Sequence, residues 1–149
     1  MNIKVTENVS SVSFNNVPLN KTVMEDALGA VAAAGINVDM ISMTAPTSEI
    51  FSFGFTVDDE DMPKLLAIVK SLREKTGTAP MINSCNRKIV LKGPEMEQHV
   101  GFAANVVGIM NRIDAMILQI TTGVDEISLL IRESDGEAAE VALRKEFNV

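Results

Sequence analysis

Tryptophan and tyrosine are absent from the sequence, and its aromatic residues are six phenylalanines. Proteins that bind single-stranded nucleic acid stack bases on aromatic side chains and hold the phosphates with a basic surface. Acidic residues outnumber basic residues here, 20 against 13, and the formal net charge is -7. The composition therefore argues against nucleic acid as a partner and predicts a core of aliphatic and methionine side chains.

Cysteine and histidine are nearly absent, with Cys85 and His99 as the single residue of each type. One cysteine cannot form an intrachain disulfide, and two ligands cannot complete a Cys/His zinc site. Cys85 is expected to be a small packed residue, and His99 a surface or capping residue. The acidic run 58–61 is expected to be the solvated start of a helix and not a metal site. We expect no metal, no cofactor, no catalytic nucleophile–base pair, and a reducing, cytoplasmic setting.

Long apolar runs are also missing. No segment approaches the roughly 20 apolar residues of a membrane-spanning helix, and residues 1–7 lack the apolar core of a signal peptide. The phosphate-binding patterns G-x-x-x-x-G-K-[ST] and G-x-G-x-x-G do not occur. We therefore expect a soluble chain with no membrane segment and no nucleotide site.

The sequence does contain an orderly series of strand and helix patterns. Residues 35–43 are the clearest strand, because Gly35 follows an alanine-rich helix as a C-cap and polar and apolar residues then alternate to Met43. Capping boxes at 22–25 and 134–137 predict two helix starts, and apolar spacing predicts helices from Met62 and Phe102. The remaining predicted strands cover 3–5, 9–14, 50–57, 81–83, 87–93, 115–122 and 126–131.

These elements form an internal repeat. Val38 and Thr22 each match a residue 79 positions later, Ile117 and Gly101, and Phe51 matches Ile127 at a spacing of 76. We predict two βαββα units, a domain at 8–84 and a domain at 85–149, with no flexible linker between them. The strand at 2–6 has no neighbour in the first domain, and the second lacks a last strand, so strand 2–6 is expected to complete the second domain.

The stretches GINVDMIS at 35–42, KIVLKG at 88–93, HVGFAANVVGIMN at 99–111 and the ending 117–147 resemble the tandem ACT domains at the C-terminal end of aspartate kinases. The resemblance covers nearly the whole chain. It implies an α+β fold of two ferredoxin-like βαββαβ ACT domains side by side, with antiparallel sheets and helices on one face. It also implies a homodimer that binds an amino-acid effector, commonly Lys or Thr, at an ACT–ACT interface. The catalytic domain of those kinases has no counterpart in the chain.

The same resemblance marks an effector site and departures from it. Related chains carry an Asp-Lys-Pro-Gly turn where this chain has Leu19 to Thr22, a Gln where it has Met43, and often an Asn where it has Met116. Loss of these polar partners favours a more apolar amino acid, or a site that binds nothing tightly. Asn37 and Asp39 contact a ligand or the partner chain, or they are simply exposed to solvent. The candidate effector-binding residues are Leu19, Asn20, Lys21, Thr22, Val23, Met24, Asn37, Asp39, Met43, Met116 and Ile117.

Three functions follow as alternatives. The first is a regulatory protein without catalytic activity that binds a small amino-acid effector at an ACT–ACT interface of a homodimer and regulates a partner enzyme of amino-acid biosynthesis. The second is a structural dimerisation module with a ligand-free effector pocket. The third is a small enzyme on a ferredoxin-like scaffold, which the missing catalytic groups disfavour.

Overall fold

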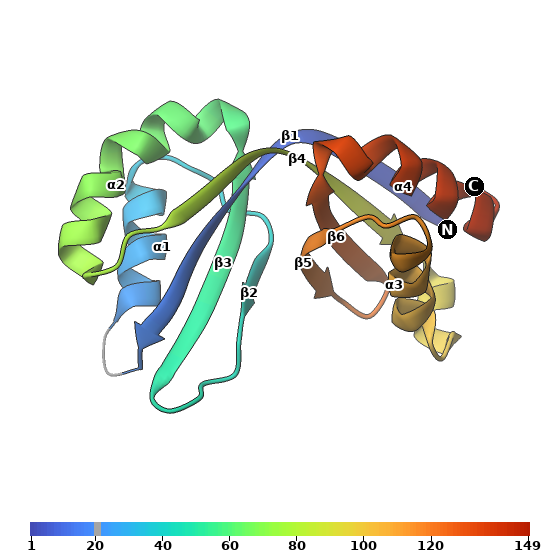
Figure 1. The fold of residues 1–149 in the computed structure, drawn as a ribbon, viewed down its shortest axis with the longest axis horizontal. Coiled ribbons are helices and arrows are strands. Elements are labelled where there is room, and N and C mark those ends of the chain that lie inside the picture. The colour runs from blue at the N-terminus through green and yellow to red at the C-terminus, as the bar shows by residue number, and fades with distance from the viewer. Residues whose placement is uncertain (20–21) are drawn as a thin grey trace. The chain divides into compact units, whose positions relative to one another are not determined.

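The computed structural model describes residues 1–19 and 22–149, and its contacts divide the chain into two compact units. The first unit is Asn8–Ser84. The second unit consists of Met1–Glu7 together with Cys85–Val149. Two strands, β1 and β4, contribute one end to each unit (Figure 1).

In the first unit, two helices pack on a sheet whose strand order is β2-β3-β1-β4. The β2–β3 and β3–β1 pairs are antiparallel. The elements are β1 (Asn2–Pro18, from residue 8), α1 (Val23–Ala33), β2 (Ile41–Met43), β3 (Ile50–Asp58), a 3-10 turn η1 (Asp59–Asp61), α2 (Met62–Thr76) and the first part of β4 (Met81–Lys92).

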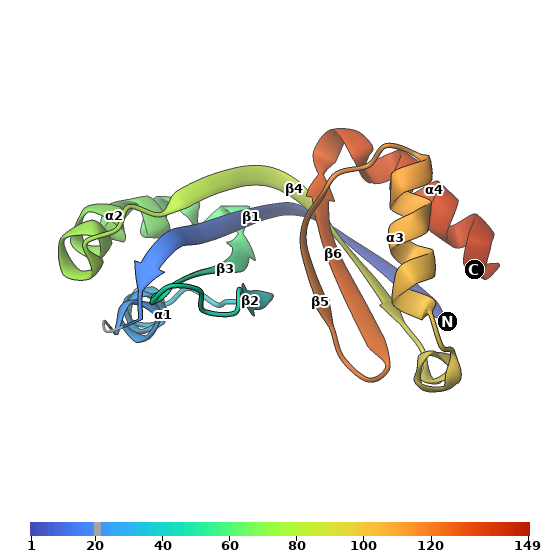
Figure 2. The same cartoon turned by 60° about the horizontal axis from the view of Figure 1, so that its bottom comes forward.

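The second unit repeats this plan, with strand order β1-β4-β6-β5 and antiparallel β4–β6 and β6–β5 pairs (Figure 2). Its elements after β4 are a 3-10 helix η2 (Pro94–Gln98), α3 (Phe102–Arg112), β5 (Ile117–Thr122), β6 (Glu126–Arg132) and α4 (Glu133–Phe147). The predicted α+β class, with two ferredoxin-like βαββαβ units, is confirmed.

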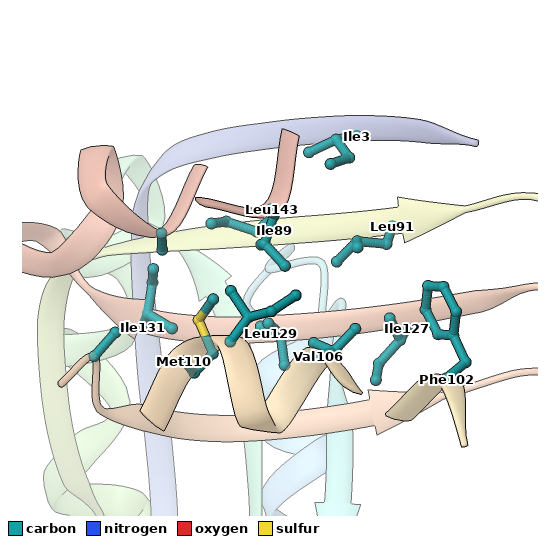
Figure 3. Packing of buried hydrophobic residues seen from close by; sticks show 13 residues of the cluster. Ile3, Ile89, Leu91, Phe102, Val106, Met110, Ile127, Leu129, Ile131 and Leu143 are labelled. Atoms are coloured by element: carbon teal, nitrogen blue, oxygen red, sulfur yellow. The ribbon is translucent and has the colours of Figure 1, made fainter. Parts of the chain in front are cut away.

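Each unit has its own core on one face of its sheet. In the second unit, Val106 and Met110 of α3 and Leu143 of α4 meet strand residues such as Ile89 and Leu129 (Figure 3). The first unit adds an aromatic layer, in which the rings of Phe14 and Phe53 stack with centroids 4.9 Å apart. Both cores are mainly aliphatic as predicted, but phenylalanines contribute to each, since Phe102 and Phe147 stack in the second unit with centroids 5.0 Å apart.

The long strands correct the predicted boundaries. Strands expected at 3–5 and 9–14 form one continuous β1, and those expected at 81–83 and 87–93 form one continuous β4. Each contains a residue in the left-handed region, Asn8 with φ 59° and Cys85 with φ 58°. Cys85 is exposed, so the expectation of a packed cysteine is wrong. The polar stretches around both residues suggested breaks, but strand pairing continues through them.

The glycines that follow α1 and α2 cap these helices as their sequence indicates, whereas the two predicted N-terminal capping boxes do not form. Gly35 and Gly77 follow α1 and α2 with φ of 73° and 72°, as C-cap glycines do. Neither capping box forms: the Thr22 hydroxyl donates to the Asp26 carboxylate, and Ser134 lies inside α4, which begins at Glu133. On α2, Leu66 was expected in the apolar stripe but is exposed, since Leu65 and Leu72 already cover the sheet.

The described residues contain neither a membrane-spanning helix nor a metal-binding cluster. Among residues 1–19 and 22–149, no helix is long and apolar enough to span a membrane. No three His, Cys, Asp or Glu side chains in those ranges are grouped closely enough to hold a metal ion. In the acidic run 58–61, Asp58 ends β3 and Asp59–Asp61 forms η1, which leads directly into α2.

Candidate effector-binding site

A shallow depression of about 470 Å³ lies in the first unit, where the end of β1 meets the β2–β3 turn. The backbone N–H of Leu19 donates to the Glu49 carbonyl oxygen at 2.9 Å, and Pro18 pairs with Ile50 across the strands. These backbone contacts hold the two chain segments together at this end of the sheet. The depression is lined by Pro18, Leu19, Ser48, Glu49 and Ile50.

The β2–β3 turn that forms one wall has an unusual backbone. Thr47 and Ile50 exchange two backbone hydrogen bonds, 2.8 and 3.1 Å long, and close a two-residue hairpin loop. Both loop residues are in the left-handed region, with φ 50° at Ser48 and 65° at Glu49. Such turns favour Asn and Gly, because a Cβ atom is strained at positive φ. The strained turn places Glu49 at the depression.

The depression combines one carboxylate with exposed apolar side chains. Leu19 is 47% exposed and Ile50 is 39% exposed, which is high for large apolar residues. Glu49 is exposed and forms no ion pair with any residue that the structure describes. The arrangement therefore offers an acceptor for an ammonium group beside a surface for an apolar side chain.

Residues at the start of α1 line a different depression. Thr22 and Val23 border a cavity of about 420 Å³, opposite the last turn of α2. Lys75 and Asp26 form an ion pair across it, with 3.5 Å between Nζ and Oδ1. Met24 is half-buried against the core. Asn20 and Lys21, which the sequence also predicted as site residues, lie outside the described residues.

Residues 36–43 keep the predicted alternation of burial, although only Ile41–Met43 is regular strand. Asn37 and Asp39 are exposed, and the Asp39 backbone N–H donates to the Thr56 carbonyl oxygen at 3.0 Å. Met43 pairs with Phe53 of β3 but is 51% exposed. Met43 is exposed because β2 is the edge strand of the sheet.

Met116 and Ile117 belong to the second unit, so they do not line the depression at Leu19. Met116 is 52% exposed, and Ile117 is half-buried at the start of β5. The Met116 N–H donates to the Asp135 carboxylate at 3.1 Å, and Arg132 Nε donates to the same oxygen at 2.9 Å. The hydrogen bond from Met116, ahead of the contact with Arg132, holds the pKa of Asp135 below its ordinary value.

Sequence reasoning missed Ser48, Glu49 and Ile50. The sequence predicts only a turn followed by a strand at these residues. They approach Leu19 because Pro18 pairs with Ile50, and that strand register is set by tertiary structure.

The chain is similar to known proteins of one kind. Residues 89–147 match the family model of the ACT domain. An aspartokinase of Pseudomonas aeruginosa is 28% identical over 95% of this chain, and the chain spans 37% of that relative's length. Several other aspartokinases are matched over a similar or smaller share of their length.

Two solved structures match nearly end to end. A chain in a crystal structure of aspartokinase alpha and beta subunits is 31% identical, with a TM-score of 0.87 and coverage of 100% of this chain and 99% of that chain. The ligand-free regulatory subunit of aspartate kinase from Thermus thermophilus has the same fold, with a TM-score of 0.88 at 20% identity over 97% of this chain and 96% of that chain. The chain therefore belongs to the ACT-domain family and is a relative of the regulatory region of aspartate kinase.

Proposed function

We propose that the chain is a regulatory module that binds a free amino acid and transmits this binding to a partner enzyme of amino-acid biosynthesis. In this proposal the chain is not itself an enzyme, it acts in the cytoplasm, and the domains 8–84 and 85–149 are two ACT domains, the second completed by strand 2–6. The observation that carries the proposal is the depression at Leu19, which holds an exposed carboxylate in a chain related to aspartate kinase regulatory subunits.

A free amino acid needs partners for both of its charges. In the proposed site, Glu49 accepts hydrogen bonds from the effector's ammonium group, in the role that related chains give to the Asp of their turn. The first N–H groups of α1 have no side-chain cap, but they border the other depression and are not assigned to this effector. The effector's carboxylate is proposed to stay solvated, since no basic side chain among the described residues lines the depression.

The side chains around the depression favour an apolar effector. Leu19 and Ile50 are exposed apolar residues in its wall, and Met43 is an exposed apolar residue on the edge strand β2. These three side chains offer no hydrogen-bond partner to a Lys ammonium or a Thr hydroxyl, and Ser48 supplies the one hydroxyl among the described lining residues. Desolvating such a polar group without a partner is costly, whereas burying an aliphatic side chain is favourable. Lys and Thr are therefore expected to bind weakly or not at all.

The site is proposed to be completed in a homodimer. Met116 and Ile117 of a second copy would cover the apolar surface left exposed on β2 and beside Leu19, as the family resemblance implies. An effector that contacts both copies stabilises one dimer packing, and that packing alters the activity of the partner enzyme by linkage.

The test is calorimetric titration with each of the twenty amino acids, on the chain and on Glu49→Gln. We expect an aliphatic amino acid to bind, and Glu49→Gln to weaken that binding roughly 10- to 100-fold, the usual cost of losing a charged hydrogen bond. Glu60→Gln is the matched control, because Glu60 is an exposed acidic residue of the same unit outside the depression. Tight binding of Lys or Thr, or equal affinity of the two Glu variants, would contradict the proposed site.

The second candidate is a structural dimerisation module with a ligand-free pocket. It is favoured by Leu19, Met43 and Met116, which stand where related chains carry polar effector contacts. A thermal-shift screen separates the two candidates, because a ligand at 100 times its Kd stabilises the folded chain by about 2.7 kcal/mol. A dimer that no amino acid stabilises would support the structural role.

A further inference from the structure

A separate cavity of about 340 Å³ lies within the second unit, between the start of α3 and the end of α4. Phe102 lies at the first position of α3 (Figure 3), and Phe147 lies at the last position of α4. Three ring side chains, two carboxylates and one amide belong to its lining, those of His99, Phe102, Phe147, Glu95, Glu146 and Asn105. The volume is at the lower end of the range of small-molecule binding sites.

One wall of this cavity is aromatic. Four of the six phenylalanines belong to the core of the first unit, and the other two line this cavity together with the single histidine. The rings of Phe102 and Phe147 stack with centroids 5.0 Å apart, and the His99 ring meets Phe102 edge-on at 6.1 Å. Phe102 is buried, whereas Phe147 is half-buried and His99 is exposed. A molecule in the cavity can therefore contact the rings of Phe147 and His99.

Each unit has a cavity between the start of its first helix and the end of its second, and four lining positions correspond. The matched residues are Val23 and Phe102, Asp26 and Asn105, Lys75 and Glu146, and Thr76 and Phe147. Lys75 pairs with Asp26 at 3.5 Å, whereas Glu146 accepts a hydrogen bond from Asn105 at 3.3 Å. At these positions the second unit has a carboxylate in place of an ammonium group, and two rings in place of a valine and a threonine side chain.

The protein holds the Glu146 carboxylate by long contacts only. Asn105 Nδ2 lies 3.3 Å from one of its oxygens, and an Arg112 nitrogen lies 3.7 Å from the other. Both distances exceed the usual value of about 2.9 Å, and such exposed pairs contribute little energy. The other lining carboxylate, Glu95, pairs with the amine of Met1 at 2.5 Å. Glu146 is therefore the carboxylate that can accept hydrogen bonds from a ligand's ammonium group.

We propose that this cavity binds a small organic ammonium ion that carries an aromatic ring. The ammonium group donates to Glu146, and the ring packs against Phe147 and His99, because aromatic rings attract both other rings and cations. The two carboxylates disfavour an organic anion of the same shape, and the described lining contains no lysine or arginine. The cavity shares no described lining residue with the depression at Leu19, so either site can exist without the other.

The experiment is an NMR titration of the full chain with phenethylammonium, followed through the ring signals of His99, the single histidine. We expect saturable shifts of these signals and of the amide signals of Phe102 and Phe147. Hydrocinnamate carries a carboxylate on the same arylethyl group, and it should give no saturable shift. Propylammonium has the charge without the ring, and it should bind more weakly than phenethylammonium.

Two glutamate variants test the role of Glu146. Glu146→Gln removes the charge of an exposed residue and should weaken phenethylammonium binding about 5-fold, the upper end for an exposed ion pair. Glu137→Gln is the matched control, because Glu137 is an exposed residue of α4 outside the described lining, and it should bind like the unmodified chain. The proposal is overturned if phenethylammonium gives no saturable shift at His99, if hydrocinnamate or propylammonium binds equally well, or if the two variants have the same affinity.

Discussion

At the scale of single residues, position 136 has no room for a side chain, because Arg87 lies against the backbone of Gly136. The Arg87 guanidinium pairs with Glu133 at 2.7 Å and with Glu7 at 2.9 Å, and the hydrogen bond with Glu133 raises the pKa of Arg87 above its ordinary value. The Arg87 side chain crosses the first turn of α4 so closely that a Cβ atom on Gly136 would overlap its Cδ atom. Arg87 thus ties β1, β4 and α4 of the second unit together.

Gly136→Ala is expected to destabilise the chain by about 1–3 kcal/mol, although alanine is the better helix former, because the new methyl group displaces Arg87. Urea unfolding measures the difference. Gly29→Ala is the matched control, since Gly29 lies within α1 and nothing approaches its Cβ position within 4 Å. The control is expected to stabilise by about 0.4–1 kcal/mol. Equal effects at both glycines would contradict the role given to Arg87.

Asp135 is expected to make the stability depend on pH. Its pKa is lowered in the folded chain, chiefly by the Met116 N–H, so the folded state favours the charged carboxylate. The stabilisation is therefore present above the unfolded-state pKa and is lost as the pH falls through the folded-state pKa. Asp135→Asn should be less stable than the unmodified chain at neutral pH and should approach it in acid. Urea unfolding at a series of pH values measures this difference, and a constant gap would refute the assignment.

At the scale of elements, the turn between β2 and β3 at the proposed site is less stable than an Asn-Gly turn of the same shape would be. Ser48 and Glu49 both take positive φ, where Asn and Gly are favoured. Residues held in such strained conformations persist at binding sites, where the position of a side chain outweighs its local cost. We interpret Glu49 as such a residue.

Replacing the turn by Ser48→Asn/Glu49→Gly should therefore stabilise the chain by roughly 1–2 kcal/mol and abolish amino-acid binding. Ser48→Asn alone is the control, and it should give part of the stabilisation while binding is retained. Thermal unfolding and calorimetric titration measure the two effects. If the double variant still binds the effector, Glu49 is not its ammonium partner.

At the scale of the whole molecule, the proposed dimer depends on exposed apolar edges in each unit. Met43 on β2 and Met116 before β5 are both about half exposed, and burial of such side chains stabilises an interface. A charge at either position would be desolvated on dimerisation, which is unfavourable.

Met43→Asp and Met116→Asp are therefore expected to shift the chain from dimer to monomer in sedimentation velocity experiments. Leu66→Asp is the control, because Leu66 is an exposed apolar residue on α2, outside the proposed interface, and its substitution should leave the dimer intact. A monomeric unmodified chain, or three variants that behave alike, would contradict the proposed interface.

The sequence predicted more of the fold than of the site. The elements were found because Gly35 and Gly77 end helices and because apolar residues recur with the period of a strand or helix. The capping boxes were misplaced because the Thr22 and Ser134 hydroxyls bond to nearby carboxylates, those of Asp26 and Asp135. The strand end was misplaced because β4 runs through Cys85. Of the predicted site residues, Leu19 lies at the depression described, whereas Glu49 was missed.

The sequence by itself determined the α+β class, the repeated order of elements and the membership of the ACT-domain family, because periodicity, turn residues and motif order are local properties of the chain. Only the tertiary structure decided which side chains share a site. Strand pairing brings Glu49 beside Leu19 in one unit and Lys92 beside Asp125 in the other. Register between distant segments has no local signal, so the residues that share the depression are known only once the chain has folded.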